Sequence, residues 1–117
     1  MTPNYTYKAK ILRVIDGDTI EAELDIGFCL TFRTKLRLLG VNSPEIHAKD
    51  EAIRKKAQES RNFTEKTLLD QEVFITTSKF DAFGRYLATV FVKTYEGTWV
   101  DFNKILLDGG YAIVFKG

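Results

Sequence analysis

The sequence has very few residues that could cross-link a small protein through disulfides or a metal. Its 117 residues include one cysteine, Cys29, and one histidine, His47. A single cysteine excludes an internal disulfide framework and a cysteine-based zinc cluster. Cys29 lies in an apolar strand pattern, and we interpret it as a small hydrophobic residue of the core. We interpret His47 as a surface loop residue.

The chain also has a net charge close to zero and no long apolar run. The formal net charge is +1, so any binding of phosphates must come from lysines and arginines placed at one site. No run approaches the roughly 18 apolar residues that cross a membrane. The first residues, MTPNYTYKAK, do not resemble a signal peptide. We therefore expect a cytoplasmic protein with no membrane partner.

What remains is the composition of a globular protein, with 44% hydrophobic and 28% charged residues. We expect one domain over residues 1–117, because no repeat, linker or low-complexity stretch interrupts the chain. Asp16-Gly17 and Gly27 mark two tight turns between segments of alternating polarity. The predicted strands are Lys8–Ile15, Thr19–Ile26 and Cys29–Leu39. In the third strand, the residues predicted to face inward are Leu30, Phe32, Leu36 and Leu38.

The period then changes to that of a helix, from about Asp50 to Leu69. Its predicted buried stripe consists of Ile53, Ala57, Ser60, Thr64 and Leu68. The remaining predicted elements are strands at Val73–Thr77 and Tyr86–Val92, a short helix at Val100–Asp108 and an extended segment at Tyr111–Phe115. This order predicts an α+β, mostly β fold, a five-stranded OB-fold barrel. One long helix lies between the third and fourth strands, and a short second helix lies near the C-terminus.

The segment RLLGVNSPE, from Arg37 to Glu45, is the strongest functional signal. It reads as the end of a buried strand that enters a short loop, which Pro44 stiffens. Arg37 supplies a permanently charged donor, and Glu45 supplies a carboxylate that could accept a proton or orient a water. The intervening Asn42 and Ser43 offer oxygen atoms. This combination is what attack on a phosphodiester requires.

Two other segments can contribute to the same site. Asp18 follows the first predicted turn, where its carboxylate could join the oxygens of Asn42 and Ser43. Such a set of hard oxygen ligands suits calcium better than zinc. Arg85 ends the predicted turn Asp81–Arg85, and with Arg37 it would flank this site from a different strand.

Taken together, these segments resemble the thermonuclease or staphylococcal-nuclease-like family of calcium-dependent nucleases. The resemblance extends from about Ile11 to Ala112, with the motifs in the family's order. It implies an OB-fold barrel and endonucleolytic hydrolysis of DNA and RNA that leaves 3′-phosphates. It also implies Ca²⁺ as cofactor, DNA or RNA as substrate, and little sequence preference.

The resemblance assigns a role to each matching position. Asp18 matches a metal-ligating aspartate, and Asp16 matches a carboxylate near the metal. Ser43 lies where the family ligates metal through a backbone carbonyl. Glu45 matches the proposed general base. The two catalytic arginines are matched by Arg37 and Arg85.

The sequence departs from the family at three places. Asn42 replaces a second metal-ligating aspartate, which predicts weaker calcium binding or another metal preference. Ala82 and Phe83 replace a lysine and a tyrosine that contact phosphate, so Phe83 could stack on a base but could not donate a hydrogen bond. We also expect Tyr111 to bind substrate. The chain stops at Gly117, before a third helix of longer members. We expect lower stability or compensating association, giving a monomer or a weak homo-oligomer.

Two other classes of function remain open on the sequence alone. One is an OB-fold module that binds nucleic acid or protein and cuts nothing, and the other is a purely structural calcium site. Glu45 favours the enzyme, because a binding module has no use for a carboxylate beside two arginines. An intracellular nuclease would endanger its own host, so we further expect a phage or mobile-element origin.

Overall fold

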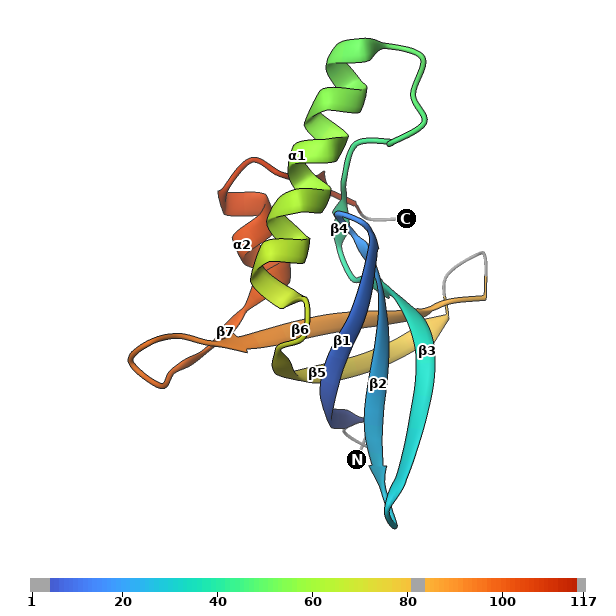
Figure 1. Cartoon of the computed structure of the whole chain (residues 1–117), viewed down its shortest axis with the longest axis vertical. Coiled ribbons are helices and arrows are strands. Elements are labelled where there is room, and N and C mark those ends of the chain that lie inside the picture. Colours follow the sequence, from blue (N-terminus) through green and yellow to red (C-terminus); the bar gives the residue numbers. More distant parts are fainter. Residues whose placement is uncertain (1–4, 81–83, 116–117) are drawn as a thin grey trace.

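The computed structural model describes residues 5–80 and 84–115 and contains a closed five-stranded barrel with two helices (Figure 1). The barrel strands are β1 (Thr6–Asp16), β2 (Thr19–Gly27), β3 (Leu30–Leu38), β5 (Glu72–Phe80) and β6 (Tyr86–Lys93). Neighbouring strands follow the order β3-β2-β1-β5-β6, and a parallel pairing of β3 with β6 closes the barrel. The predicted fold class is therefore confirmed.

Inward-facing aliphatic side chains fill the barrel. Alternate residues of each strand point inward because the side-chain period of a strand is two. The largest fully buried side chains of the strands are Ile11, Val14, Ile20, Leu36, Leu38, Val73, Ile75 and Val90. The parallel contact that closes the barrel is short and pairs Leu36–Leu38 with Tyr86–Ala88. Where β3 and β6 pair, from Leu36 to Leu38, the interior of the barrel is therefore tightly packed.

The helix α1 (Glu51–Leu68) covers the end of the barrel at which β1 turns into β2 (Figure 1). Asp50 caps its N-terminus by accepting a hydrogen bond from the Ala52 N–H at 2.8 Å. The predicted stripe is buried at Ala57, Ser60, Thr64 and Leu68. Ile53 was wrongly included, since it is 42% exposed.

The second helix, α2 (Phe102–Asp108), begins two residues later than predicted. The preceding residues form β7 (Trp99–Asp101), which pairs with β6 and extends the sheet beyond the barrel. At the C-terminus of α2, Gly110 has a φ of +75°. This left-handed residue allows the Tyr111 N–H to bond the Leu106 carbonyl at 3.0 Å, as the Gly-Gly pair predicted.

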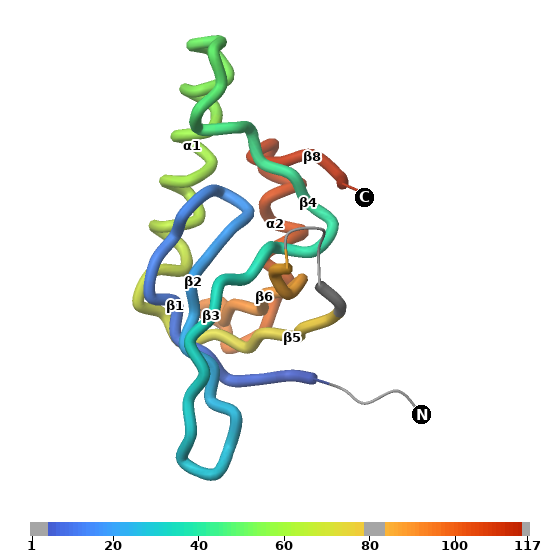
Figure 2. The backbone as a smooth tube through the Cα atoms, turned by 90° about the vertical axis from the view of Figure 1, so that its right-hand side faces the viewer, coloured from blue at the N-terminus to red at the C-terminus, as the bar shows by residue number. Residues whose placement is uncertain are grey.

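A two-stranded sheet joins two segments far apart in the chain. The strand β4 (Val41–Asn42) pairs antiparallel with β8 (Ile113–Val114), with Val41 opposite Val114. Figure 2 shows β8 beside the segment that leaves β3. The segment that carries the predicted site residues is thereby held by the polypeptide that follows α2.

The hairpin between β2 and β3 differs most from the prediction. Leu30 and Phe32 were predicted to be inward and Cys29 to be a core residue, but all three are exposed. Alternation identifies the face of a strand correctly, but this hairpin extends past the barrel (Figure 2), and its side chains there stay exposed. The turn residues Phe28 and Cys29 have φ values of +57° and +61°. Such angles suit Asn or Gly and cost other residues about 1–2 kcal/mol each.

Among the described residues, no helix is long and apolar enough to cross a membrane.

Candidate active site at the polar end of the barrel

A group of polar residues meets where β1 turns into β2, and we call this the polar end. Asp18 is at its centre and is only 3% exposed. Its Oδ1 accepts a hydrogen bond from Thr19 Oγ1 at 3.0 Å, and its Oδ2 accepts one from the Ser43 N–H at 3.0 Å. Arg37 Nη1 lies 3.0 Å from the same Oδ2. A buried carboxylate is stable only with such partners.

Arg37 is held in one orientation by groups from three segments. Its Nη2 donates to the Val41 carbonyl and to Asn42 Oδ1, both at 3.1 Å. The ring of Phe115, next to β8, lies 5.3 Å from the guanidinium carbon, within the range of a cation–π contact. The Asp18 pair and these two bonds engage three of the five N–H groups that an arginine carries.

The structure brings Asn42 and Ser43 to Asp18, but with other contacts than those predicted. Both were expected to offer oxygen atoms to a metal. In the structure, Asn42 Oδ1 accepts from Arg37, and Ser43 presents its backbone N–H to Asp18, while the expected metal ligation stays a prediction. A neutral amide can orient the guanidinium without adding a second negative charge beside it. The contacts of Asn42 thus serve the arginine.

Carboxylates accumulate beside this cluster. The pKa of Asp16 is raised above its usual value, first by burial and then by the negative charge of Asp18. The charge of Glu45 raises it further, whereas His47 and Arg85 act in the opposite direction. Glu45 itself is exposed, so its carboxylate is open to water. The predicted site residues Asp18 and Glu45 therefore both act electrostatically on Asp16.

Arg85 approaches from the neighbouring strand, because β6 pairs with β3 at Arg37. It precedes β6, and its Nη1 lies 3.5 Å from Thr19 Oγ1. The Thr19 hydroxyl also bonds Asp18, so it connects the second arginine to the buried carboxylate. We did not select Thr19 from the sequence, although its position directly after Asp18 was a usable signal. Phe115 was also missed as a neighbour of Arg37, because no local pattern reports a contact made across the fold.

Contacts with both helices fix the turn and the loop of the polar end. Thr64 Oγ1 on α1 donates to the Gly17 carbonyl at 2.9 Å. A Cβ at Gly17 would clash with Ser60 Oγ, so only glycine lets the turn approach α1 this closely. On α2, the buried Asn103 donates to the Leu39 and Ala88 carbonyls at 2.9 and 3.0 Å. These bonds fix the end of β3, from which Arg37 projects.

Two predicted substrate-binding residues are not part of this cluster. The ring of Tyr111 stacks on Phe63 of α1, with centroids 4.1 Å apart, so it packs between the helices. Tyr111 is only partly buried, and its expected binding of substrate stays a prediction. Phe83 lies outside the described residues.

The cluster offers part of what a hard divalent cation needs. Within the described parts of the chain, no group of three histidine, cysteine, aspartate or glutamate side chains is placed to hold a metal. The donors present are the carboxylates of Asp16 and Asp18, whose crowding a bound cation would relieve. Calcium accepts backbone and water oxygens for the rest of its shell. The residues therefore fit a calcium ion that is only partly ligated by side chains.

Comparison with known proteins supports a family assignment. Residues 35–117 match the family described as "Staphylococcal nuclease homologue". An uncharacterised protein of Methanocaldococcus jannaschii is 31% identical over 129 aligned residues, which cover 93% of this chain and 59% of that protein. The thermonuclease of Staphylococcus hyicus is 34% identical over 85 residues, which cover 71% of this chain and 47% of that enzyme. The chain thus spans roughly half the length of these relatives.

The matched region contains most of the polar end. Arg37, Asn42, Ser43, Glu45 and Arg85 lie inside residues 35–117, whereas Asp16 and Asp18 precede them. The match covers well over half of the chain and agrees with the barrel and its two helices. The chain therefore belongs to the staphylococcal nuclease homologue family.

Proposed function

We propose that the protein is a calcium-dependent endonuclease that hydrolyses DNA and RNA with little sequence preference and leaves 3′-phosphates. The observation that carries the proposal is the fixed guanidinium of Arg37, held by Asp18, Val41 and Asn42 beside a group of carboxylates. Membership in the nuclease family and the name of the Staphylococcus hyicus relative support the same assignment.

The two arginines would bind the scissile phosphate. Arg37 keeps two N–H groups beyond the three that its described contacts engage, and these can donate to phosphoryl oxygens. Arg85 approaches from β6 on the far side of Thr19. Negative charge builds on the phosphoryl oxygens as water attacks, and donors fixed beforehand stabilise it without rearrangement.

Glu45 would be the general base. Its exposed carboxylate lies close enough to Asp16 to raise the pKa of Asp16, so it borders the cluster while staying in contact with solvent. In this role it takes a proton from the attacking water. The new bond forms between the water oxygen and phosphorus, the bond from phosphorus to the 5′-oxygen breaks, and the departing 5′-oxygen takes a proton from solvent water to become a hydroxyl.

Asp18 and Asp16 would hold the calcium ion, with the Ser43 carbonyl as a further oxygen donor. Bound calcium supplies positive charge that binds the phosphate and offsets the charge of the transition state. The role of Asn42 is different, because its amide oxygen is bonded to Arg37. Asn42 would orient the arginine and leave its full charge available to the phosphate.

The test is degradation of heat-denatured DNA in calcium, magnesium or EDTA by the wild type, Glu45→Gln and a control, Glu96→Gln. Glu96 is an exposed carboxylate in the turn between β6 and β7, away from the polar end. We expect calcium-dependent cleavage that falls by roughly 10²–10³-fold in Glu45→Gln and is unchanged in Glu96→Gln.

An absence of cleavage by the folded wild type with either metal would overturn the proposal. DNA that is retained in EDTA with its length unchanged would then identify a binding module, the other class that the sequence leaves open.

A further inference from the structure

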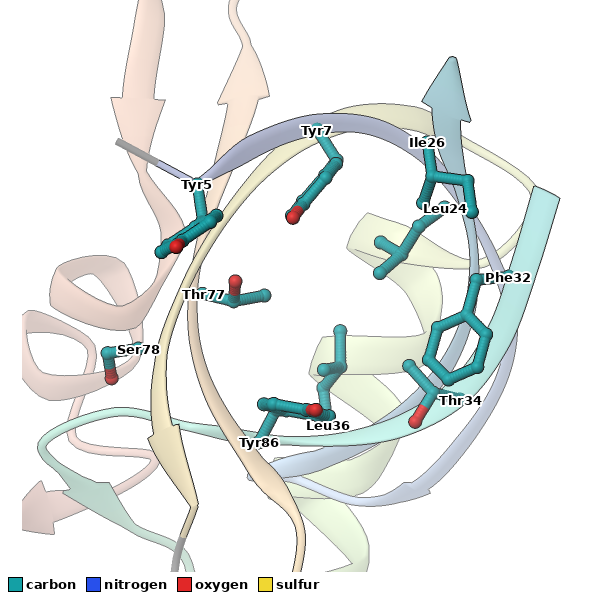
Figure 3. Close-up of a pocket in the computed structure, with 10 residues that line it drawn as sticks. All are labelled: Tyr5, Tyr7, Leu24, Ile26, Phe32, Thr34, Leu36, Thr77, Ser78 and Tyr86. Carbon is teal, nitrogen blue, oxygen red and sulfur yellow. The ribbon is translucent and has the colours of Figure 1, made fainter. Parts of the chain in front are cut away.

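The opposite end of the barrel is open, and a hollow of about 300 Å³ lies there (Figure 3). We call it the open end. Its walls come from the beginning of β1, from β5 and β6, and from the part of the β2–β3 hairpin that extends past the barrel. Aromatic side chains line much of it, namely Tyr5, Tyr7, Phe32 and Tyr86. Figure 3 shows Tyr7, Phe32 and Leu24 directed into the space that these strands surround.

The same end of the molecule carries an exposed aromatic side chain that does not stabilise the isolated chain. Phe28 is 95% exposed at the tip of the hairpin. Its backbone has a φ of +57°, where Asn or Gly would be more stable. A fully exposed phenylalanine in an unfavourable conformation gains nothing in a monomer. Exposed Ile26 and Leu30 flank it and enlarge the apolar surface.

The backbone beside the hollow also lacks partners. The strand β3 pairs with β6 only over Leu36–Leu38. In the described residues, no strand pairs with the outer edge of β3 between Leu30 and Lys35. A strand edge whose backbone groups have no strand partner can pair with a strand of another chain.

We propose that the open end is a self-association surface: the hairpin of a second copy inserts its Phe28 into the hollow, and the contact is reciprocal about a two-fold axis. One chain supplies both the protruding aromatic side chain and an aromatic-lined recess of sufficient volume, as an isologous contact requires. The net charge of +1 opposes such association only weakly.

Charge argues against two other occupants of this surface. The side chains that line the hollow carry no charge, so a nucleic-acid phosphate has no partner there. No lysine or arginine lies between Ile26 and Phe32, and Glu23 and Asp25 precede the tip. An anionic membrane would repel these carboxylates and find no basic residue at the tip.

The test is sedimentation equilibrium of the full chain from about 10 µM to about 1 mM, the range expected for a small interface. The variants are Phe28→Asn, Ser78→Arg and the control Tyr95→Ser. Asn suits the left-handed turn, so Phe28→Asn should fold at least as well as the wild type. Ser78 is an exposed residue at the rim of the hollow. Tyr95 is a fully exposed aromatic residue in the β6–β7 turn.

We expect a monomer–dimer equilibrium in the wild type and in Tyr95→Ser, with dimerisation weakened about 10–30-fold in each of the other two variants. A mixture of Phe28→Asn with Ser78→Arg should recover part of the association, because one of the two contacts is then intact. The single Cys29, at the tip, should react more slowly with iodoacetamide as the dimer forms.

Three results would overturn the proposal. The first is a monomer at all concentrations, and the second is a dimer that Phe28→Asn leaves unchanged. The third is flotation of the wild type, but not of Phe28→Asn, with phosphatidylserine vesicles, which would assign the tip to a membrane. If Phe28→Asn weakens dimerisation and Ser78→Arg does not, the contact would involve the tip of the hairpin and not the hollow.

Discussion

The two ends of the barrel differ in what covers the ends of the strands. At the polar end, α1 covers the strands, and buried polar groups such as Asp18 and Asn103 have hydrogen-bond partners. At the open end, no helix covers the strands in the described structure, and tyrosines surround a hollow. The polar end is therefore specified by directional bonds, whereas the open end is specified only by the alternation of its strands.

This difference predicts different tolerance to substitution. Removing one member of a bonded network leaves its partners buried and unsatisfied, which is costly. Changing an exposed residue at the rim of the hollow should leave the free energy of unfolding of one chain nearly unchanged. The following predictions test whether the two ends differ in this way, from the largest expected effect to the smallest.

The largest effect is expected from Arg37→Met, which keeps the length of the side chain but leaves the buried Asp18 carboxylate without its cation. Breaking such a pair costs about 3–5 kcal/mol of the free energy of unfolding. Urea denaturation measures it, with Arg61→Met as the matched control. Arg61 pairs with Glu65 on the surface of α1, where such a pair is worth about 0.3–0.5 kcal/mol. A similar small loss in both variants would mean that the buried pair at the polar end is worth no more than a surface pair.

An intermediate effect is expected from Gly17→Ala, because the new Cβ would clash with Ser60 Oγ and push the Asp16–Asp18 turn away from α1. Overpacking of this kind costs about 1–3 kcal/mol. The control is Ser60→Ala, whose lost hydroxyl has no described hydrogen-bond partner, so it should be neutral or slightly stabilising. The double variant should recover part of the loss, as thermal unfolding would show. Full additivity of the two changes would mean that the turn and the helix do not meet.

The smallest effect is expected from Asp16→Asn and depends on pH. Because the pKa of Asp16 is raised in the folded state, the folded protein binds this proton more tightly than the unfolded chain. Stability is therefore greatest with Asp16 protonated, and it declines as pH rises from the usual value near 3.8 through the raised pKa. Without divalent ions at neutral pH, Asp16→Asn should raise Tm by about 2–4 °C.

The gain should disappear below about pH 3.8, where the wild-type carboxylate is protonated as well. Added calcium should favour the wild type, because only the aspartate can bind it. A variant less stable than the wild type in EDTA at neutral pH would show that Asp16 is not crowded by Asp18 and Glu45.

The sequence predicts the barrel well because strands and helices leave periodic patterns. Asp16-Gly17 locates the first turn, and the change of period after Glu45 locates α1. The same patterns fail at Leu30 and Phe32, since alternation says which side chains share a face but not whether anything covers that face. Ile53 fails for the same reason at the exposed beginning of α1.

The residues of the polar end could be predicted as a group, but not their contacts. Asp18, Arg37, Asn42 and Ser43 do meet. The hydrogen bond from Arg37 to the Asn42 oxygen depends on where β4 places the loop. The contact of Phe115 with Arg37 depends on the pairing of β8 with β4, which joins distant segments and has no local signature.

That pairing also sets the order in which the polar end can be completed. In the described structure, β8 is the only strand that pairs with β4, and it is made more than half a chain length after it. While the protein is being translated, Asp18, Arg37 and Asn42 leave the ribosome long before Phe115 does. The barrel strands up to β6 can associate in that interval, but Arg37 still lacks its aromatic neighbour and Val41 lacks its strand partner. A growing chain therefore lacks these two contacts of the polar end until residues 113–115 have been made and have docked.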